Sequence, residues 1–416
     1  MSGAPIGDRR RFERLPGGGY VYELVDEPLR IEARHLRRDH SQLHAEVDVI
    51  CDWAGVKTHN RSLSCADLNL SSQSARRTLA THCAQRAGTK PTEFDWLGAL
   101  DAACLEVIRA ERQGEAPIIL DDAPDVLARD LDVFGLTVPA DAASMLIAHG
   151  DSLKSLLVLL VLGTLAQRGQ PVLLLDWEWS ADRHRARKRR LLGAERLERL
   201  HYLRCRAPLV LECDRVRRYC DEQQIAFLGV DSVGLAADGP LKDDDVAIRF
   251  HRALASLPPA LCAAHVPKSA VSTDVKVDPI GPFGSVFFAN LSRASWLVKK
   301  QPGPSDDVVT VGLFPQKQND NARQRPVGLE FAFSADRIGV RPVDLAGVAG
   351  LGERLPLAVR MMHVLRRGPL SFAEIANELD AKLDSVIKAA KRCPAFTKVD
   401  GTDGKPRIAL VERRIA

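Results

Sequence analysis

MLIAHGDSLKSLLVLLVL, which occupies residues 145–162, joins a short apolar run to a longer one through a small polar loop. The runs predict a buried strand over Met145–Ala148 and a helix that begins near Lys154. Backbone N–H groups converge at a helix N-terminus and can bind phosphate there. Lys154 could reach the outer phosphates of a nucleoside triphosphate, and the Ser155 hydroxyl could hold Mg²⁺. The expected nucleotide contacts are therefore Gly150, Asp151, Ser152, Leu153, Lys154 and Ser155.

The loop departs from the usual phosphate-binding pattern at two glycine positions. Ala148 stands six residues before the lysine, and Leu153 directly precedes it. A leucine fits if its φ is negative, whereas a positive φ would cost about 1 kcal/mol or more and lower nucleotide affinity. The loop alone also fits an ordinary strand-to-helix turn, so further support must come from the residues that follow it.

Two acidic residues and a histidine follow apolar runs further along the chain. Glu178 closes the run that begins at Val172, where it could orient a water near a γ-phosphate or simply open a solvated helix. Asp231 closes a second run, the form expected of a carboxylate that holds Mg²⁺ through water. His265 stands at the end of the next one.

Apolar runs alternate with helical patterns between Ala143 and Val340, which predicts an α/β core with strands buried on both faces. The expected strands are residues 145–148, 171–175, 225–230, 261–264, 285–288 and 309–313. Before this core, residues 1–115 predict a small α+β accessory domain of unknown role, and residues 116–138 a connector. We expect the core over residues 139–345 and a last domain over residues 346–416.

The last domain shows three helical patterns and a hairpin. Ser371 and Glu374 have capping-box spacing at the start of the second helix. Helices and hairpin resemble a winged-helix domain, whose third helix would lie in the DNA major groove. The resemblance assigns phosphate contacts to Lys388, Lys391 and Arg392 on that helix and to Lys405 and Arg407 on the wing; a protein-docking role remains the alternative.

The order of motifs in the core resembles the RecA-fold ATPase core of hexameric replicative helicases of the DnaB and RepA type, over residues 139–340. The resemblance implies ATP and Mg²⁺ as cofactors. It implies that Glu178 positions the attacking water, that Asp231 and Ser155 serve the metal, and that His265 is a polar sensor. Pro282–Ser285, Asn290 and Arg293 resemble the stretch that follows the sensor in RepA-like proteins.

Related helicases carry a Lys-x-Arg pair that reaches the nucleotide of the neighbouring subunit. Lys317 fits the lysine, but Asn319 occupies the arginine position. Arg323 or Arg325 could substitute, Arg293 could act instead, or the contact between subunits could be weaker. A solvated loop between strands would explain the same residues.

A basic run at Arg183–Arg190 holds six Lys or Arg in eight residues and leads into a helical pattern over residues 191–200. A solvated helix face is the leading interpretation, and a surface for DNA or another subunit is the alternative. Over the whole chain, 58 basic against 54 acidic residues leave a net charge of only +4, too small to indicate a nucleic-acid partner.

Composition places the chain among ordinary globular proteins of the cytoplasm. No apolar run approaches the roughly 20 residues that cross a bilayer, so no membrane partner is expected. The nine cysteines show no metal-ligand spacing and are expected to be reduced thiols.

Together these patterns and the two resemblances imply a DNA-associated, ring-forming ATPase. It would be a homohexamer that serves as replicative helicase or helicase loader of a mobile element or phage-like replicon, with DNA and possibly other replication proteins as partners. Two alternatives stay open: a RecA-like recombination or repair ATPase, and a nucleotide-regulated DNA-binding protein with little turnover.

Overall fold

The computed structural model describes residues 10–15, 18–53, 55–56, 58, 60–90, 93–114, 117–123, 130–266, 282–318, 324–401 and 406–411. Its chain divides into two compact units, Met1–Val126 and Leu127–Ala416. The expected residues Arg323, Asn319 and Lys405 lie outside the described part.

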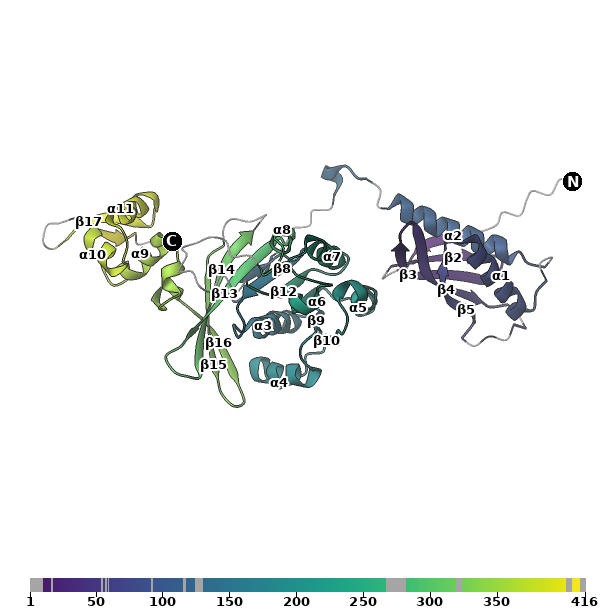
Figure 1. The fold of residues 1–416 in the computed structure, drawn as a ribbon, viewed down its shortest axis with the longest axis horizontal. Helices are drawn as coiled ribbons and strands as arrows, with labels where there is room; N and C mark the ends of the chain where they lie inside the picture. Colours follow the sequence, from purple (N-terminus) through teal and green to yellow (C-terminus); the bar gives the residue numbers. More distant parts are fainter. Residues whose placement is uncertain are drawn as a thin grey trace. The chain divides into compact units, whose positions relative to one another are not determined.

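The first unit packs two helices on an antiparallel sheet (Figure 1). Residues of β4 alternate between buried and more exposed, because one sheet face meets the helices and the other meets solvent. The sheet order is β1 (Arg10–Arg14), β2 (Tyr20–Leu24), β3 (Leu29–Asp39), β4 (Gln42–Cys51), β5 (Ser62–Asn69). The helices are α1 (Gln73–Ala87) and α2 (Trp96–Gln113).

A nine-stranded sheet forms the centre of the second unit. Six strands are parallel, in the order β10 (Leu200–Arg204), β9 (Val172–Asp176), β11 (Phe227–Asp231), β12 (Ala260–His265), β8 (Ser144–Ala148), β13 (Ala294–Pro302). Three antiparallel strands extend it: β14 (Val308–Gln318), β15 (Val327–Phe333), β16 (Ile338–Val343). All residues of β8, β9 and β11 are buried, as the continuous apolar runs predict.

Helices cover both faces of the parallel strands (Figure 1). One face carries α3 (Lys154–Gln167) and α4 (Ala181–Leu192). The other carries α5 (Leu209–Gln223), α6 (Val233–Ala236), α7 (Asp244–Ala255) and α8 (Phe287–Leu291). Strands β8, β12, β11 and β9 run parallel, so the loop after β8 and the C-terminal ends of β9 and β11 lie at the same edge of the sheet. This arrangement confirms the expected α/β class with a RecA-like core.

Two local expectations for the core are wrong. The strand expected at residues 285–288 is instead a turn and the start of α8: the Ser285 hydroxyl accepts the Phe287 N–H, and Phe288 is fully buried. The helical pattern expected over residues 191–200 ends at Leu192, because Gly193 leaves the helix at φ 92° and β10 follows.

A short hairpin precedes the sheet. β6 (Leu131–Val133) and β7 (Leu136–Val138) bury their apolar side chains in the core of the second unit, and the Trp296 indole N–H donates to the carbonyl of Thr137 at 3.0 Å. The part of the expected connector that follows residue 130 is therefore packed structure.

A group of three helices and a hairpin follows the sheet, with an apolar core of its own. It comprises α9 (Leu357–Leu365), α10 (Phe372–Glu378), α11 (Leu383–Arg392), β17 (Phe396–Asp400) and β18 (Pro406–Leu410). The capping box is formed: the Glu374 N–H donates to the Ser371 hydroxyl, and the Ser371 N–H donates to the Glu374 carboxylate. Among the described residues, no helix combines the length and apolar character that a membrane span requires.

Candidate functional site

The backbone of the loop after β8 is strained at Leu153, the position where the usual phosphate-binding pattern has a glycine. Leu153 directly precedes α3 with φ 62° and ψ 18°, and Asp151 also has a positive φ of 55°. The Ser152 hydroxyl braces the loop by donating to the carbonyls of His149 at 2.8 Å and Gly150 at 3.3 Å. The loop therefore adopts a left-handed turn at a leucine, which is unfavourable for a residue with a Cβ.

The Lys154 ammonium lies inside this loop, and the residue as a whole is only 7% exposed. It donates to the carbonyls of His149 at 2.7 Å and Ala148 at 3.3 Å. Burial lowers the pKa of Lys154, while the nearby Asp231 and Glu178 carboxylates oppose that shift. The ammonium is therefore held at the N-terminus of α3, where it would contact a bound phosphate.

Asp231 ends β11 beside the loop and is 2% exposed. Burial raises its pKa, against a hydrogen bond from the Ser155 hydroxyl. Its Oδ2 has no hydrogen-bond partner among the described residues. An unpaired buried carboxylate oxygen beside a hydroxyl is a donor set that fits Mg²⁺, which prefers oxygen ligands.

Glu178 lies two residues beyond the end of β9, the strand that pairs with β11, and accepts a hydrogen bond of 2.7 Å from the Ser232 hydroxyl. The turn that carries it is anchored by Asp176, which accepts the N–H groups of Glu178 at 3.1 Å and Trp179 at 2.8 Å. Burial would raise the pKa of Asp176, but hydrogen bonds from His184 and these N–H groups prevail and lower it. The position of Glu178 therefore depends on a buried, charged anchor.

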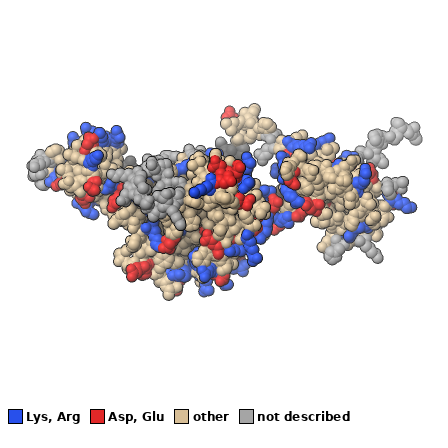
Figure 2. Space-filling model, in the orientation of Figure 1, with Lys and Arg blue, Asp and Glu red and all other residues tan. Residues whose placement is uncertain are grey.

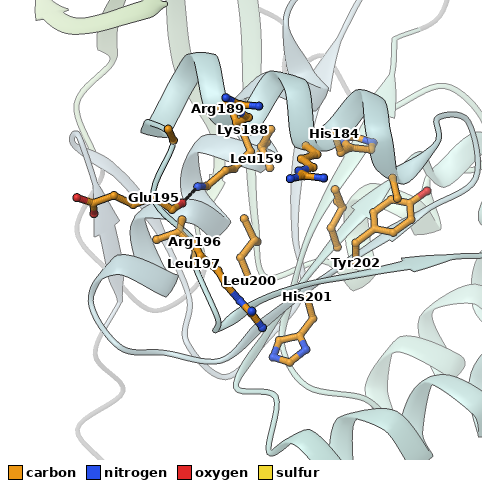
Figure 3. Close-up of a pocket in the computed structure, with 14 residues that line it drawn as sticks. Leu159, His184, Lys188, Arg189, Glu195, Arg196, Leu197, Leu200, His201 and Tyr202 are labelled. Carbon is orange, nitrogen blue, oxygen red and sulfur yellow. Dashed lines mark hydrogen bonds between the residues drawn. The ribbon is translucent and has the colours of Figure 1, made fainter.

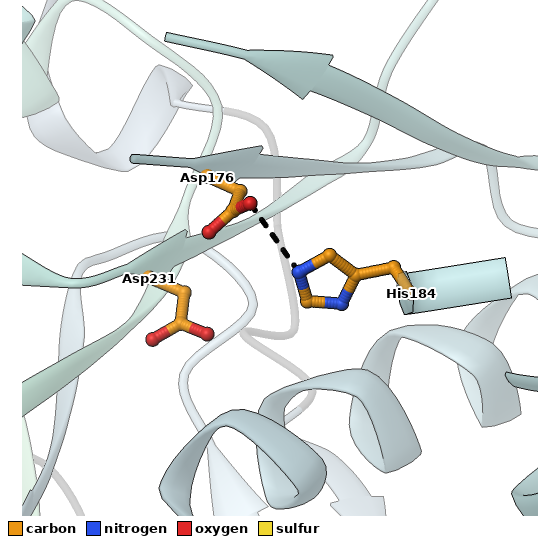
Figure 4. Close-up of side chains that lie close together, drawn as sticks. All are labelled: Asp176, His184 and Asp231. Carbon is orange, nitrogen blue, oxygen red and sulfur yellow. Dashed lines mark ion pairs between the residues drawn. The ribbon is translucent and has the colours of Figure 1, made fainter. Parts of the chain in front are cut away.

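Asp176, His184 and Asp231 bring their polar atoms within 4.8 Å of one another (Figure 4). His184 Nε2 lies 3.4 Å from Asp176 Oδ2, and the Arg204 guanidinium donates to the same oxygen at 3.2 Å. Tyr202 also donates to it, at 3.1 Å. Because Asp176 already accepts hydrogen bonds from Tyr202, Arg204 and two backbone N–H groups, the unpaired oxygen of Asp231 is the better metal ligand of the two carboxylates.

One cavity of about 340 Å³ brings together most of the expected site. Lys154, Ser155, Glu178, Asp231 and His265 all line it. The His265 Nδ1 lies 3.5 Å from the Lys154 ammonium, and partial desolvation together with that ammonium lowers the pKa of His265.

The same cavity is lined by residues that the sequence interpretation left out of the site: Trp179, Arg187, Arg190, Phe333 and Ile338. The signal for the arginines was present, since the basic run begins five residues after Glu178 and a three-residue spacing puts two of its arginines on one helix face. Phe333 and Ile338 come from β15 and β16 and carry no comparable signal.

The basic run is α4, and it is not simply a solvated face. His184 and Lys188 are 4% and 9% exposed. The Lys188 ammonium donates to the carbonyls of Gly193 and Glu195, beside a second cavity of about 480 Å³ (Figure 3). That cavity lies between α4 and β10 and is separate from the loop after β8.

Lys317 and Arg293 do not join the cavity within one chain. Both flank the start of the β13 strand, opposite the first residues of β8, whereas the loop follows the last residue of β8. The Lys317 ammonium donates to the carbonyls of Ala289, Asn290 and Ser292 at 3.2, 2.6 and 2.7 Å. All three of its N–H donors therefore cap the end of α8. Arg325 is described, in the segment before β15.

Of the basic residues expected to contact DNA, the four that the structure describes belong to the last helical group. Lys388 pairs with Asp384 at 2.6 Å, and Lys391 and Arg392 end α11. Arg407 lies on β18 and donates to the Pro369 carbonyl at 3.4 Å. Figure 2 shows basic and acidic side chains intermixed over the visible face of the molecule, in keeping with the small net charge.

Comparison with known proteins yields fold neighbours alone. No protein-family model matches the chain, and no curated protein matches its sequence. A KaiC-like protein from the hyperthermophilic archaeon Pyrococcus horikoshii is similar over 49% of this chain and 91% of its own, with 12% identity and a TM-score of 0.38. The flagellar accessory protein FlaH from Methanocaldococcus jannaschii is similar over 49% and 89%, with 12% identity and a TM-score of 0.37. Likeness at this level carries no argument about activity.

Proposed function

We propose that the protein is a Mg²⁺-dependent ATPase. The observation that carries the proposal is the convergence of Lys154, Ser155, Asp231 and Glu178 on one cavity at the carboxyl edge of parallel strands. Each supplies a different part of phosphoryl chemistry, and ordinary packing gives no reason for all four to meet there.

Each residue of the proposed ATP site has a distinct role. N–H groups at the start of α3 and the Lys154 ammonium bind the phosphates, and the ammonium exchanges carbonyl partners for phosphate oxygens. Ser155 and Asp231 would hold Mg²⁺, which neutralises phosphate charge when bound. Glu178 orients a water for attack, and the Ser232 hydroxyl fixes the carboxylate in place. His265 lies beside Lys154, where it can respond to the phosphate.

Steady-state ATP hydrolysis by the full chain, with and without single-stranded DNA, tests this proposal. We expect Mg²⁺-dependent turnover that Lys154→Ala abolishes together with ATP binding, because the buried ammonium is the cation inside the phosphate loop. Lys299→Ala is a control, since Lys299 lies on β13 and does not line the cavity. Absence of ATP binding by the wild-type chain would refute the proposal.

The finer role we propose is that of a DNA-associated, ring-forming motor, a replicative helicase or helicase loader. Its parts would be an accessory domain over residues 1–115, a connector, an ATPase domain over residues 139–345 and a winged-helix domain over residues 346–416. The helical group around α11 supports the last of these by its helix order and hairpin. Electron microscopy with ATP distinguishes closed rings from the filaments of a recombination ATPase.

One observation favours a second candidate, a nucleotide-regulated DNA-binding protein with little turnover. Leu153 holds a left-handed conformation in the loop itself, so the phosphate-binding shape is strained. ATP binding with negligible hydrolysis, unchanged by DNA, would support this candidate over the motor.

A further inference from the structure

Two arginines of α4 face the cavity that Lys154 and Glu178 line. Arg187 and Arg190 are three residues apart, so both project toward the same side of the helix. The helix begins at Ala181, three residues after Glu178. The arginines therefore belong to the same subunit and the same short segment as the water-orienting carboxylate.

Both guanidinium groups keep unused donors at this place. Arg187 Nη1 and Arg190 Nε are buried and have no hydrogen-bond partner among the described residues. A buried N–H without a partner is unfavourable, and it is rare in a structure unless a ligand or water completes it. Arg190 donates one other N–H to the carbonyl of Ser334, which lies between β15 and β16. This hydrogen bond holds the side chain toward those two strands.

Trp179 holds Arg187 in position. The Arg187 guanidinium lies 4.2 Å from the centre of the indole ring, and that of Arg183 lies 4.5 Å from it. Stacking on an aromatic ring fixes a guanidinium plane and leaves its N–H groups directed outward. Arg183 shares the stacking but does not line the cavity, so it is a natural control.

The charge of the cavity leaves room for an anion. Its acidic residues are Asp151, Glu178 and Asp231, but Asp151 is paired with Lys300 at 2.7 Å. Against the remaining two stand Lys154, Arg187 and Arg190. Guanidinium groups bind phosphate oxygens by paired N–H donors, which suits the terminal phosphate of a nucleotide.

We infer that Arg187, with Arg190 beside it, binds the terminal phosphate of the nucleotide from within its own subunit. The inference rests on the proposed ATP site. It assigns to Arg187 the phosphate contact that the arginine of the Lys-x-Arg pair makes in related helicases, a position that Asn319 occupies in this sequence. It also agrees with the use of all three Lys317 donors inside the chain. In this arrangement the phosphate is recognised in cis.

Binding of a non-hydrolysable ATP analogue and of ADP, measured by calorimetry on the full chain, tests the inference. We expect Arg187→Ala to weaken the analogue about 10- to 100-fold, as expected when charge-assisted hydrogen bonds are lost. ADP affinity should change less than about threefold, because ADP lacks the phosphate concerned. Arg183→Ala should leave both affinities unchanged.

The outcomes separate the inference from the proposed function. Equal losses for the two nucleotides, or no loss, would overturn the role of Arg187 while leaving the ATP site in place. If the wild-type chain bound neither nucleotide, both would fail. Arg187→Gln keeps most of the side-chain length, and thermal unfolding of both variants shows that they fold; the same selective loss is expected for each.

Mixing protomers tests the cis assignment. Arg187→Ala and Lys154→Ala each damage the site of their own subunit, so mixed assemblies should recover no hydrolysis. Recovery in verified mixed assemblies would mean that Arg187 completes a neighbour's site, and would overturn the inference.

Discussion

At the residue scale, Leu153 is the most informative position. The sequence left its φ open, and the structure assigns it the left-handed value that disfavours a branched or long side chain. No sequence pattern could have decided this, because φ depends on how the loop closes between β8 and α3. By contrast, the meeting of four expected residues in one cavity was predictable, since Asp231 and Glu178 close apolar runs and Lys154 and Ser155 open one.

Replacing Leu153 by Gly should tighten ATP binding relative to Leu153→Ala. Both variants remove the leucine side chain, but only glycine removes the Cβ that makes the left-handed turn costly by about 1 kcal/mol. We expect a difference of about threefold to tenfold in Kd between them. Equal Kd values for the two variants would show that strain at this residue does not limit binding.

Glu178→Gln should separate binding from chemistry. The amide keeps the size of the side chain and its bond from Ser232, but it cannot orient or accept a proton from water. We expect ATP affinity within about threefold of wild type and kcat lower by about 100-fold or more. Glu195→Gln, outside this cavity, is the matched control. Wild-type kcat in Glu178→Gln would remove this carboxylate from the mechanism.

At the element scale, the buried strands and the main helices were predictable, but the elements at the edges were not. β10 follows a charged turn, and its residues are only partly buried, so it lacks a continuous apolar run. The stretch at residues 285–288 was read as a strand because three apolar residues follow one another. Val286 is in fact exposed and Phe288 buried, which suits the helix and turn that form there.

Contact between α3 and β11 depends on Gly229. A Cβ at this glycine would lie 2.6 Å from Leu162 Cδ1 and 2.6 Å from Val158 Cγ1, both on α3. We expect Gly229→Ala to destabilise the protein by about 1 to 3 kcal/mol through overpacking. Gly339→Ala is the control, because its nearest neighbours lie at 3.9 Å. Thermal unfolding that is unchanged in Gly229→Ala would contradict this packing.

The α7–α8 contact should make stability depend on pH. Burial lowers the pKa of His251 to about 4, although its hydrogen bond with the Phe288 carbonyl acts the other way. Above pH 6.5 the ring is neutral in both folded and unfolded chains. As pH falls from 6.5 to 4, only the unfolded chain gains the proton, so wild type loses stability, by up to roughly 3 kcal/mol.

Denaturant unfolding at several pH values checks this loss. His251→Gln should show a shallower decrease over the same window, whereas His40→Gln, at an exposed position, should follow wild type. Parallel curves for His251→Gln and wild type would exclude this histidine as the source.

At the scale of the whole molecule, changes in pattern along the chain predict three domains, and this division stays a prediction, since the structure divides into two compact units. The division of the structure at Val126, within the expected connector, could not be located by pattern, since the β6–β7 hairpin is short and joins the core of the second unit. The partners of each part remain proposals, because the face of the molecule seen in Figure 2 mixes basic and acidic side chains.

Duplex DNA binding by the full chain should depend on α11. Replacing Lys388, Lys391 and Arg392 together by Ala should weaken binding and reduce the slope of log affinity against log salt by roughly two to three units, since each phosphate contact contributes about 0.9. ATP hydrolysis without DNA should persist, because these side chains do not line the cavity. An unchanged slope would favour protein docking as the role of this helical group.

The anchoring of the turn after β9 by Asp176 has a consequence for how this sequence can vary. One carboxylate meets His184 of α4, Arg204 of β10 and the backbone that carries Glu178. A substitution there would disturb the carboxylate side of the cavity and the arginine side at once. Among homologues, we therefore expect positions 176, 184 and 204 to change together or not at all. Positions 293 and 317, at the opposite end of the strands, should vary independently of them.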